Sequence, residues 1–147
     1  MAGTVIRSAI SEDLPAVLAM VSDLHASTKM ALPIDPAATM GMLRRLVGSP
    51  DGLLLVVEAG GTLKGFLAAT VGVTPISFEQ VGMELGWWAG PEAKGTGLRL
   101  LVHYERWAKS RGCRIARMST PPHNERAAQI LRRRGFFVSE LAWVKAI

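Results

Sequence analysis

Residues 84–112 read ELGWWAGPEAKGTGLRLLVHYERWAKSRG, and this stretch decides the fold. A strand-like apolar run ends at Gly90-Pro91, a basic glycine-rich turn follows at residues 94–97, and a helical pattern begins at once. The first backbone N–H groups of a helix have no acceptor inside the helix, and the helix dipole puts partial positive charge there. Glycines at 95 and 97 let a ligand come close to the backbone. The stretch therefore predicts a strand, a turn and a helix N-terminus that bind an anion.

The spacing of the glycines separates this turn from two common phosphate loops. A P-loop requires GxxxxGK[ST], and a dinucleotide fingerprint requires GxGxxG, whereas Leu100 stands three residues after Gly97. The segment PEAKGTGLR resembles instead the pyrophosphate loop [QR]xxGx[GA] of the GNAT superfamily of acyl-CoA N-acyltransferases. In this resemblance Lys94 takes the Arg/Gln position, and Arg99 stands where Gly or Ala is usual.

Charge is divided unevenly along the chain. Residues 1–93 contain 5 Lys/Arg and 9 Asp/Glu, and residues 94–147 contain 12 Lys/Arg and 3 Asp/Glu, for a net charge of +5. The basic half begins at the glycine turn, where it would attract a polyanion such as coenzyme A. Nucleic acid would be drawn by the same field, but few aromatic residues are free to stack on bases, so this partner is disfavoured. A solvated basic surface is the remaining alternative.

Length and composition predict one globular domain over residues 1–147. No apolar run is long enough to span a membrane, and the first residues do not form a secretory signal, so membrane partners are not expected. The single cysteine, Cys113, excludes an internal disulfide, fits a cytoplasmic location, and is expected to be a buried, unreactive thiol.

Periodicity and turn signals predict the element order β-α-α-β-β-β-α-β-α-β. The expected strands are 5–9, 53–59, 62–73, 80–89, 113–119 and 136–146. Ser11 is expected to cap the first helix and Asp35-Pro36 to start the second, which ends at residues 48–50. Gly60-Gly61 predicts a two-residue hairpin turn, and residues 124–134 predict a helix closed by Gly135.

A second segment strengthens the resemblance. Asn124-Glu125-Arg126-Ala127, followed by Gly135-Phe136, is similar to the N-x-x-A…Gly-Phe segment of the same superfamily. The element order is also the one this family uses. The sequence therefore predicts an α/β fold with a single mixed, mostly antiparallel sheet and helices on both faces.

The resemblance implies acetyl-CoA as cofactor. It implies that Trp88 and Ala89 offer backbone groups to the pantetheine arm, in a gap between this strand and the next one. Alternation puts Trp87 and Trp88 on opposite faces of the sheet, so one of the two is expected to be core. The remaining cofactor-binding candidates are Lys94, Gly95, Thr96, Gly97, Leu98, Arg99 and Asn124. For Arg99 three readings stay open: a solvated side chain, a grip on the pyrophosphate, or a side chain that crowds the ligand.

The resemblance implies an N-acetyltransferase that moves an acetyl group directly to an amine. Glu84 is the candidate general base, because the family often places a glutamate on this strand, with a rim carboxylate as the alternative. His123 and His25 are weaker candidates. The histidines have no metal-site spacing, and no metal is expected.

One departure favours a rival reading. Family members with a tyrosine general acid carry it seven residues after the asparagine, where Leu131 stands here. The only tyrosine, Tyr104, falls on the apolar side of its helix and is expected to be core. The rival is a GNAT-like domain that has lost turnover and serves as a binding or structural module. The sequence leaves the small-molecule or peptide amine acceptor unnamed, and a homodimer stays open.

Overall fold

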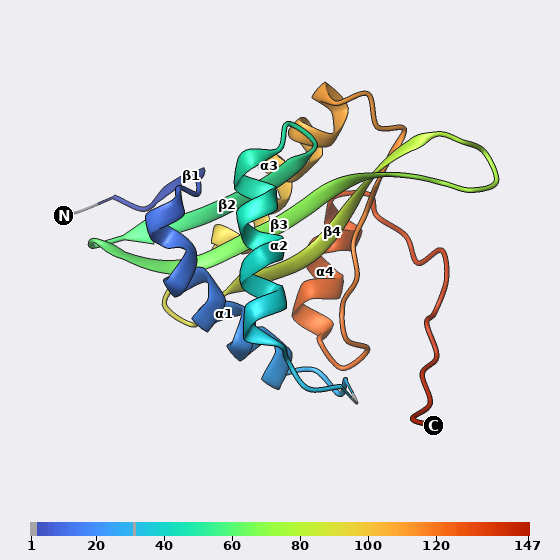
Figure 1. The fold of residues 1–147 in the computed structure, drawn as a ribbon. Helices are drawn as coiled ribbons and strands as arrows, with labels where there is room; N and C mark the ends of the chain where they lie inside the picture. The colour runs from blue at the N-terminus through green and yellow to red at the C-terminus, as the bar shows by residue number, and fades with distance from the viewer. Residues whose placement is uncertain (1–2, 31) are drawn as a thin grey trace.

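The computed structural model describes residues 3–30 and 32–147 and contains a five-stranded sheet in the order β1-β2-β3-β4-β5 (Figure 1). The strands are β1 (Val5–Ser8), β2 (Gly52–Ala59), β3 (Thr62–Val73), β4 (Gln80–Ala89) and β5 (Ile115–Arg117). Neighbours from β1 to β4 pair antiparallel, whereas β4 and β5 pair parallel. The predicted fold class, a mixed and mostly antiparallel sheet with helices on both faces, is confirmed.

Two helices cover each face of the sheet. The helices α1 (Leu14–Ala26) and α2 (Pro36–Gly48) lie in front of it in Figure 1, and α3 (Thr96–Ser110) and α4 (Glu125–Arg133) lie behind it. The front core is built on Val17, Leu43 and Phe66, and the rear core on Leu67, Leu101 and Tyr104. Apolar residues therefore alternate between two cores along β2 and β3, as expected for strands buried on both faces.

Several local signals form the predicted elements. The Asp35 carboxylate accepts a hydrogen bond from the Ala38 N–H at 3.0 Å, so it caps α2. Gly60 and Gly61 both have positive φ, 59° and 78°, which suits a tight hairpin turn between β2 and β3. Asn124 caps α4 by accepting from the Ala127 N–H at 3.1 Å.

Three expectations are corrected. Ser11 does not cap α1: residues 11–13 form a short 3-10 helix, η1 (Ser11–Asp13), and Ile10 precedes it. The strand expected over residues 113–119 is shortened to β5. The strand expected over residues 136–146 is absent, because this segment pairs with no strand in the described parts of the chain and its apolar side chains stand in solvent. An apolar pattern alone does not make a strand, because a strand also needs backbone hydrogen bonds to a neighbour, and residues 137–147 form none within the described parts of the chain.

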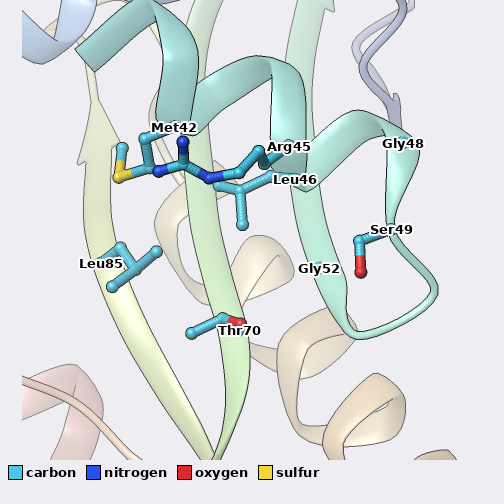
Figure 2. Close-up of a pocket in the computed structure, with 8 residues that line it drawn as sticks. All are labelled: Met42, Arg45, Leu46, Gly48, Ser49, Gly52, Thr70 and Leu85. Carbon is cyan, nitrogen blue, oxygen red and sulfur yellow. The ribbon is translucent and has the colours of Figure 1, made fainter. Parts of the chain in front are cut away.

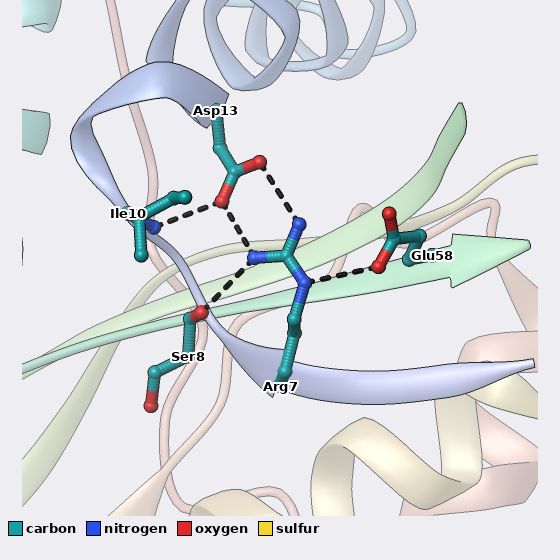
Figure 3. A network of polar contacts seen from close by, with 5 residues as sticks. All are labelled: Arg7, Ser8, Ile10, Asp13 and Glu58. Carbon is teal, nitrogen blue, oxygen red and sulfur yellow. Dashed lines mark hydrogen bonds and ion pairs between the residues drawn. The ribbon is translucent and has the colours of Figure 1, made fainter. Parts of the chain in front are cut away.

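One arginine on β1, Arg7, links the first strand to η1 and to β2 (Figure 3). The Arg7 guanidinium on β1 donates two hydrogen bonds to the Asp13 carboxylate, at 2.7 and 3.0 Å, and a third to Glu58 on β2 at 3.1 Å. Asp13 also accepts from the Ile10 N–H at 2.8 Å. The hydrogen bonds from Arg7 hold the pKa of Asp13 below its ordinary value. This network joins η1 and the start of α1 to the edge of the sheet.

In the part of the chain that the structure describes, no helix combines the length and the apolar character needed to cross a membrane.

We expect Asp13→Asn to lower the free energy of unfolding by about 1–2 kcal/mol, because it weakens a half-buried bidentate ion pair. The native pKa of Asp13 is depressed, so its contribution exists above the unfolded pKa and is lost as the pH falls through the native value. The difference between wild type and variant, measured by urea unfolding, should therefore shrink in acid.

Asp51→Asn is the matched control. Asp51 also pairs with an arginine, Arg111 at 3.1 Å, but its side chain is 62% exposed. Exposed pairs contribute little, so this variant should stay within about 0.5 kcal/mol of wild type. Equal losses in the two variants would contradict a special role for the Arg7 network.

Candidate active site

The glycine turn leads directly into the N-terminus of α3. Gly95 precedes the helix with φ of 80°, a conformation that side chains rarely adopt. Thr96 is buried, and its hydroxyl donates to the Ala93 carbonyl oxygen, so its side chain is committed to shaping the turn. Lys94 and Arg99 are exposed on either side. A Cβ built at Gly95 would meet no atom within 4 Å, which leaves the turn open to a ligand.

A tryptophan on the strand holds this turn in place. The Trp87 indole N–H donates to the Gly97 carbonyl oxygen at 3.1 Å, and a Cβ added at Gly97 would lie 3.6 Å from the Trp87 ring. Trp87 packs in the rear core and Trp88 in the front core, as alternation predicted. The indole contact could not be predicted from the sequence, because it joins residues that are neighbours only in space.

The strands β4 and β5 part just before the predicted cofactor residues. Their parallel pairing consists of Val81 with Ile115, Gly82 with Ala116, and Met83 with Arg117. Residues 84–89 pair with β3 alone, so their other edge has no strand partner in the described chain. Trp88 and Ala89 lie on this stretch of β4. Successive residues of a strand point their N–H and C=O groups to opposite edges, and Trp88 faces β3, so Ala89 is the one of the two that presents backbone groups to the open edge.

A β-bulge sets the direction of Glu84. Ala68 pairs with Gly86 and the next residue, Ala69, pairs with Glu84, so Leu85 is an extra residue in β4. A Cβ at Gly86 would meet Phe66 of the front core, whereas Glu84 lies opposite Ala69 of the rear core. The bulge thus places Glu84 on the same face as Trp87 and α3.

The Glu84 carboxyl lies partly buried at the point where the two strands part. Its Oε1 accepts a hydrogen bond from the Ser119 N–H at 3.3 Å, from the segment that follows β5. Burial raises the pKa of Glu84 from 4.5 to about 7, and the Ser119 hydrogen bond opposes this shift only in part. A carboxyl with this pKa exchanges its proton near neutral pH.

Tyr104 is fully buried, as predicted. Its hydroxyl donates to the Arg117 carbonyl oxygen at 2.7 Å and lies against Gly82. Burial, and then the nearby Glu84 carboxylate, raise the pKa of Tyr104 above its ordinary value. This tyrosine is a hydrogen-bonded part of the rear core. Cys113 is half-buried, and burial likewise raises the pKa of its thiol.

The other candidate residues lie away from the point where β4 and β5 part. Leu131 on α4 packs against the rear core, so an apolar side chain stands at the position of the tyrosine general acid that the family resemblance implies. His123 is exposed before α4, and His25 is half-buried in the last turn of α1. Leu98 is 42% exposed on the first turn of α3. Within residues 3–30 and 32–147, no hydrogen bond joins either histidine to Glu84.

A groove of about 610 Å³ opens on the front face between α2 and the sheet (Figure 2). Its wall on α2 carries Met42, Arg45 and Leu46, and its floor carries Thr70 on β3 and the bulged Leu85 on β4. The lining residues include one cationic side chain and no carboxylate. The groove contacts β4 at Leu85, which follows Glu84 in the sequence, whereas Glu84 itself lies on the rear face of the sheet.

The sequence model of the acetyltransferase (GNAT) family matches residues 18–136. The chain therefore belongs to this family, as the resemblance predicted, and acetyl-CoA is confirmed as the cofactor at the level of the family. No curated protein sequence matches the chain.

Solved structures agree in fold. The chain is similar to a transcriptional regulator from Bacillus halodurans C-125, with a TM-score of 0.80, 20% identity, and coverage of 99% of this chain and 100% of that one. It is similar to the aminoglycoside N-acetyltransferase AAC(6')-Iy in complex with CoA, with a TM-score of 0.79, 18% identity, and coverage of 100% and 96%. A predicted acetyltransferase with acetyl-CoA from Clostridium acetobutylicum gives a TM-score of 0.80, 12% identity, and coverage of 99% and 96%.

We expect opposite effects at the two glycines of the turn. Gly95→Ala should lower the free energy of unfolding by about 1–2 kcal/mol, because alanine is strained at positive φ. Gly97→Ala should be neutral or stabilising by up to about 1 kcal/mol, because Gly97 lies within α3 and its added Cβ makes only ordinary contact. Urea unfolding of both variants measures this, and a destabilised Gly97→Ala would contradict it.

Proposed function

We propose that this chain is an acetyl-CoA-dependent N-acetyltransferase that moves an acetyl group directly to an amine, with Glu84 as general base. The observation that carries the proposal is the position of Glu84: a carboxyl with a pKa of about 7 stands where β4 leaves β5, on the same strand whose end leads into the glycine turn. Anion-binding and proton-accepting groups thus lie along one strand.

The open edge and the turn fit the cofactor. The backbone of Gly95, Thr96, Gly97 and Leu98 would hold the pyrophosphate at the α3 N-terminus, with Lys94 and Arg99 adding positive charge. Ala89 would bond the pantetheine arm through the unpaired edge of β4, with Trp88 beside it in the strand. Acetyl-CoA supplies an activated acetyl thioester when bound. Asn124 is the weakest member of the set, since its side-chain oxygen already caps α4.

Glu84 has the environment of a base that works near neutral pH. Its carboxylate is held by one backbone N–H and is otherwise partly withdrawn from water, so it binds a proton more tightly than an exposed glutamate. An ammonium acceptor must lose a proton before it can attack, and Glu84 would accept it directly or through water. Tyr104 donates its own hydrogen to Arg117 and takes no part.

The groove on the front face is the proposed acceptor site. Leu85, which lines the groove, is next to Glu84 in sequence, and residues 84–89 have no outer strand partner in the described chain. An amine seated in the groove would therefore have to reach the Glu84 carboxyl, on the rear face, around the open edge of β4. Several similar structures are aminoglycoside N-acetyltransferases. A polycationic aminoglycoside would meet Arg45 and no lining carboxylate, so an amine on an apolar or anionic body suits this groove better.

The rival, a binding module without turnover, is favoured by Leu131, which removes the usual acid from α4. Coenzyme A binding without acetyl transfer across a panel of amines (amino acids, peptides, aminoglycosides) would support the module. Transfer to any amine excludes it.

We expect Glu84→Gln to lower kcat/KM by about 10²–10⁴-fold and to leave coenzyme A affinity near the wild-type value. In the wild type, kcat/KM should rise with pH through about 7, because the base is active only when ionised. Glu84 binds its proton more tightly in the native state than in the unfolded chain, so its burial costs stability above pH 7. The variant should therefore melt at a higher temperature than wild type at alkaline pH.

Glu79→Gln makes the same chemical change on the exposed β3–β4 loop and serves as the control. It should alter neither rate nor melting temperature. A Glu84→Gln enzyme that keeps its rate within a few-fold would show that another group accepts the proton.

Arg99→Ala should weaken coenzyme A binding by about 1.5–3 kcal/mol if the guanidinium grips a phosphate, as calorimetry can measure. Arg106→Ala, an exposed arginine farther along α3, removes the same charge away from the turn and should weaken binding far less. Tighter binding in Arg99→Ala would mean that Arg99 crowds the ligand, and equal small losses in both variants would assign it to the solvated surface.

A further inference from the structure

One cation at the front-face groove has no partner of opposite charge. Arg45 on α2 lines the groove, and it pairs with no carboxylate in the described ranges 3–30 and 32–147. Among the described residues that line the groove, it is the only one with a charge. An unpaired guanidinium beside a concave surface is suited to bind an anion, because its planar set of N–H donors matches a carboxylate.

The Arg45 side chain is directed along the groove and not toward the end of its helix. Figure 2 shows it running toward Met42, which lines the same groove. A Cβ built at Gly41, one turn earlier in α2, would lie 3.9 Å from Arg45 Nη1. A cation that served the helix dipole would instead approach the last carbonyl groups of α2, which ends at Gly48. The charge of Arg45 is therefore available to a ligand in the groove.

The other walls of the groove are largely apolar. Met42 and Leu46 line it on α2, and Leu85 lines it on β4 and is 43% exposed. The Thr70 hydroxyl donates to the Asp51 carbonyl oxygen at 3.3 Å, so it is already engaged. Methylene groups of a ligand would be withdrawn from water against these apolar side chains, which favours an apolar chain beside the cation.

The groove and the proposed base lie on opposite faces of β4. Leu85 lines the groove on the front face, whereas Glu84 lies opposite Ala69 of the rear core. An acceptor that is held by Arg45 on α2 and gives its proton to Glu84 must extend from the helix around the open edge of the strand. Its anionic group and its amine must therefore be several bonds apart. An α-amino acid carries both groups on the same carbon and could not reach both residues.

We propose that Arg45 selects acceptors in which a carboxylate and the reacting amine stand at opposite ends of an apolar chain, as in an ω-amino acid. This inference rests on the proposed acetyltransferase function and adds the class of acceptor to it. The guanidinium binds the carboxylate, and the methylene chain lies against Met42 and Leu85. In the transfer, the amine nitrogen bonds to the acetyl carbon as the carbon–sulfur bond breaks, its proton passes to Glu84, and coenzyme A leaves as the thiolate.

Acetyl transfer to a series of small amines tests the selection. ε-Aminocaproate carries its amine and its carboxylate at opposite ends, hexylamine lacks the carboxylate, and hexamethylenediamine replaces it with a second ammonium. Norleucine, an isomer of ε-aminocaproate, carries both groups on the same carbon. The wild type should favour ε-aminocaproate over each of the others by at least about tenfold in kcat/KM, because only this compound satisfies both Arg45 and Glu84.

Substitutions on α2 assign the preference to one side chain. Arg45→Ala should remove most of the preference for ε-aminocaproate over hexylamine, by raising KM with little change in kcat, because the carboxylate is bound before and during transfer alike. Arg45→Glu should turn the preference toward hexamethylenediamine. Arg44→Ala is the matched control: it removes the same charge from the adjacent exposed residue, which does not line the groove, and should keep the wild-type ratio.

A binding measurement separates this inference from the proposed function. Hexanoate has the carboxylate and the chain but no amine. In an NMR titration it should shift the amides of Thr70 and Leu85 in the wild type and in Glu84→Gln, and it should bind at least about tenfold more weakly to Arg45→Ala. Hexanoate binding that depends on Arg45, without transfer to any amine, would overturn the acetyltransferase function and retain the carboxylate site.

The opposite pattern would overturn the inference alone. Acetyl transfer with no preference for ε-aminocaproate over hexylamine or norleucine would show that the groove does not select a distant carboxylate. An Arg45→Ala enzyme with the wild-type ratio, an equal loss in Arg44→Ala, or hexanoate binding that is unchanged in Arg45→Ala would show that Arg45 does not bind it. A general loss of stability or of acetyl-CoA affinity lowers the rate with every amine and leaves these ratios unchanged.

Discussion

The early end of the pairing between β4 and β5 is the constraint on which the candidate site depends. Three residue pairs join these strands, and then β4 continues for six residues bonded on one side only. Main-chain groups in a protein interior need partners, so an unpaired edge beside two cores is a place where a ligand can substitute for a strand. The glycine turn, the indole contact to Gly97 and the carboxyl of Glu84 all lie along this edge.

Glu84 and Tyr104 lie near the point where β4 and β5 part, but they differ in their access to solvent and in their hydrogen bonds. Glu84 and Tyr104 face the same core, but the tyrosine is fully buried and gives its hydrogen to a backbone oxygen, while the carboxyl stays partly open with a single weak donor. Burial raises the pKa of both groups, which makes the tyrosine inert at physiological pH and brings the carboxyl into the range where it exchanges protons. Burial thus keeps the Tyr104 hydroxyl protonated and allows the Glu84 carboxyl to exchange a proton near neutral pH.

Features that depend on a few adjacent residues could be predicted from the sequence. Asp35-Pro36, Gly60-Gly61 and the turn at Gly95 each fix the backbone locally, and each was placed correctly. Features set by distant partners could not. Ser11 had the chemistry of a cap, but the Asp13 carboxylate accepts the hydrogen bond from the Ile10 N–H, and Arg7 on β1 holds that carboxylate in place. The apolar pattern of residues 136–146 predicted a strand, but a strand also depends on backbone hydrogen bonds to a neighbouring strand, and residues 137–147 form none in the described parts of the chain.

The bulge at Leu85 determines the face of the sheet on which Glu84 lies, because it adds one residue between Glu84 and Gly86. With strict alternation, Glu84 would share a face with Gly86 and Trp88 and point toward α1 and α2. Deleting Leu85 would remove the bulge and leave Glu84 directly before Gly86, so the carboxylate would keep its place opposite Ala69 on the rear face. In a relative with a regular strand, a carboxylate on this face would stand directly before the glycine, in the place of Leu85, whereas a glutamate two residues before the glycine would face α1 and α2.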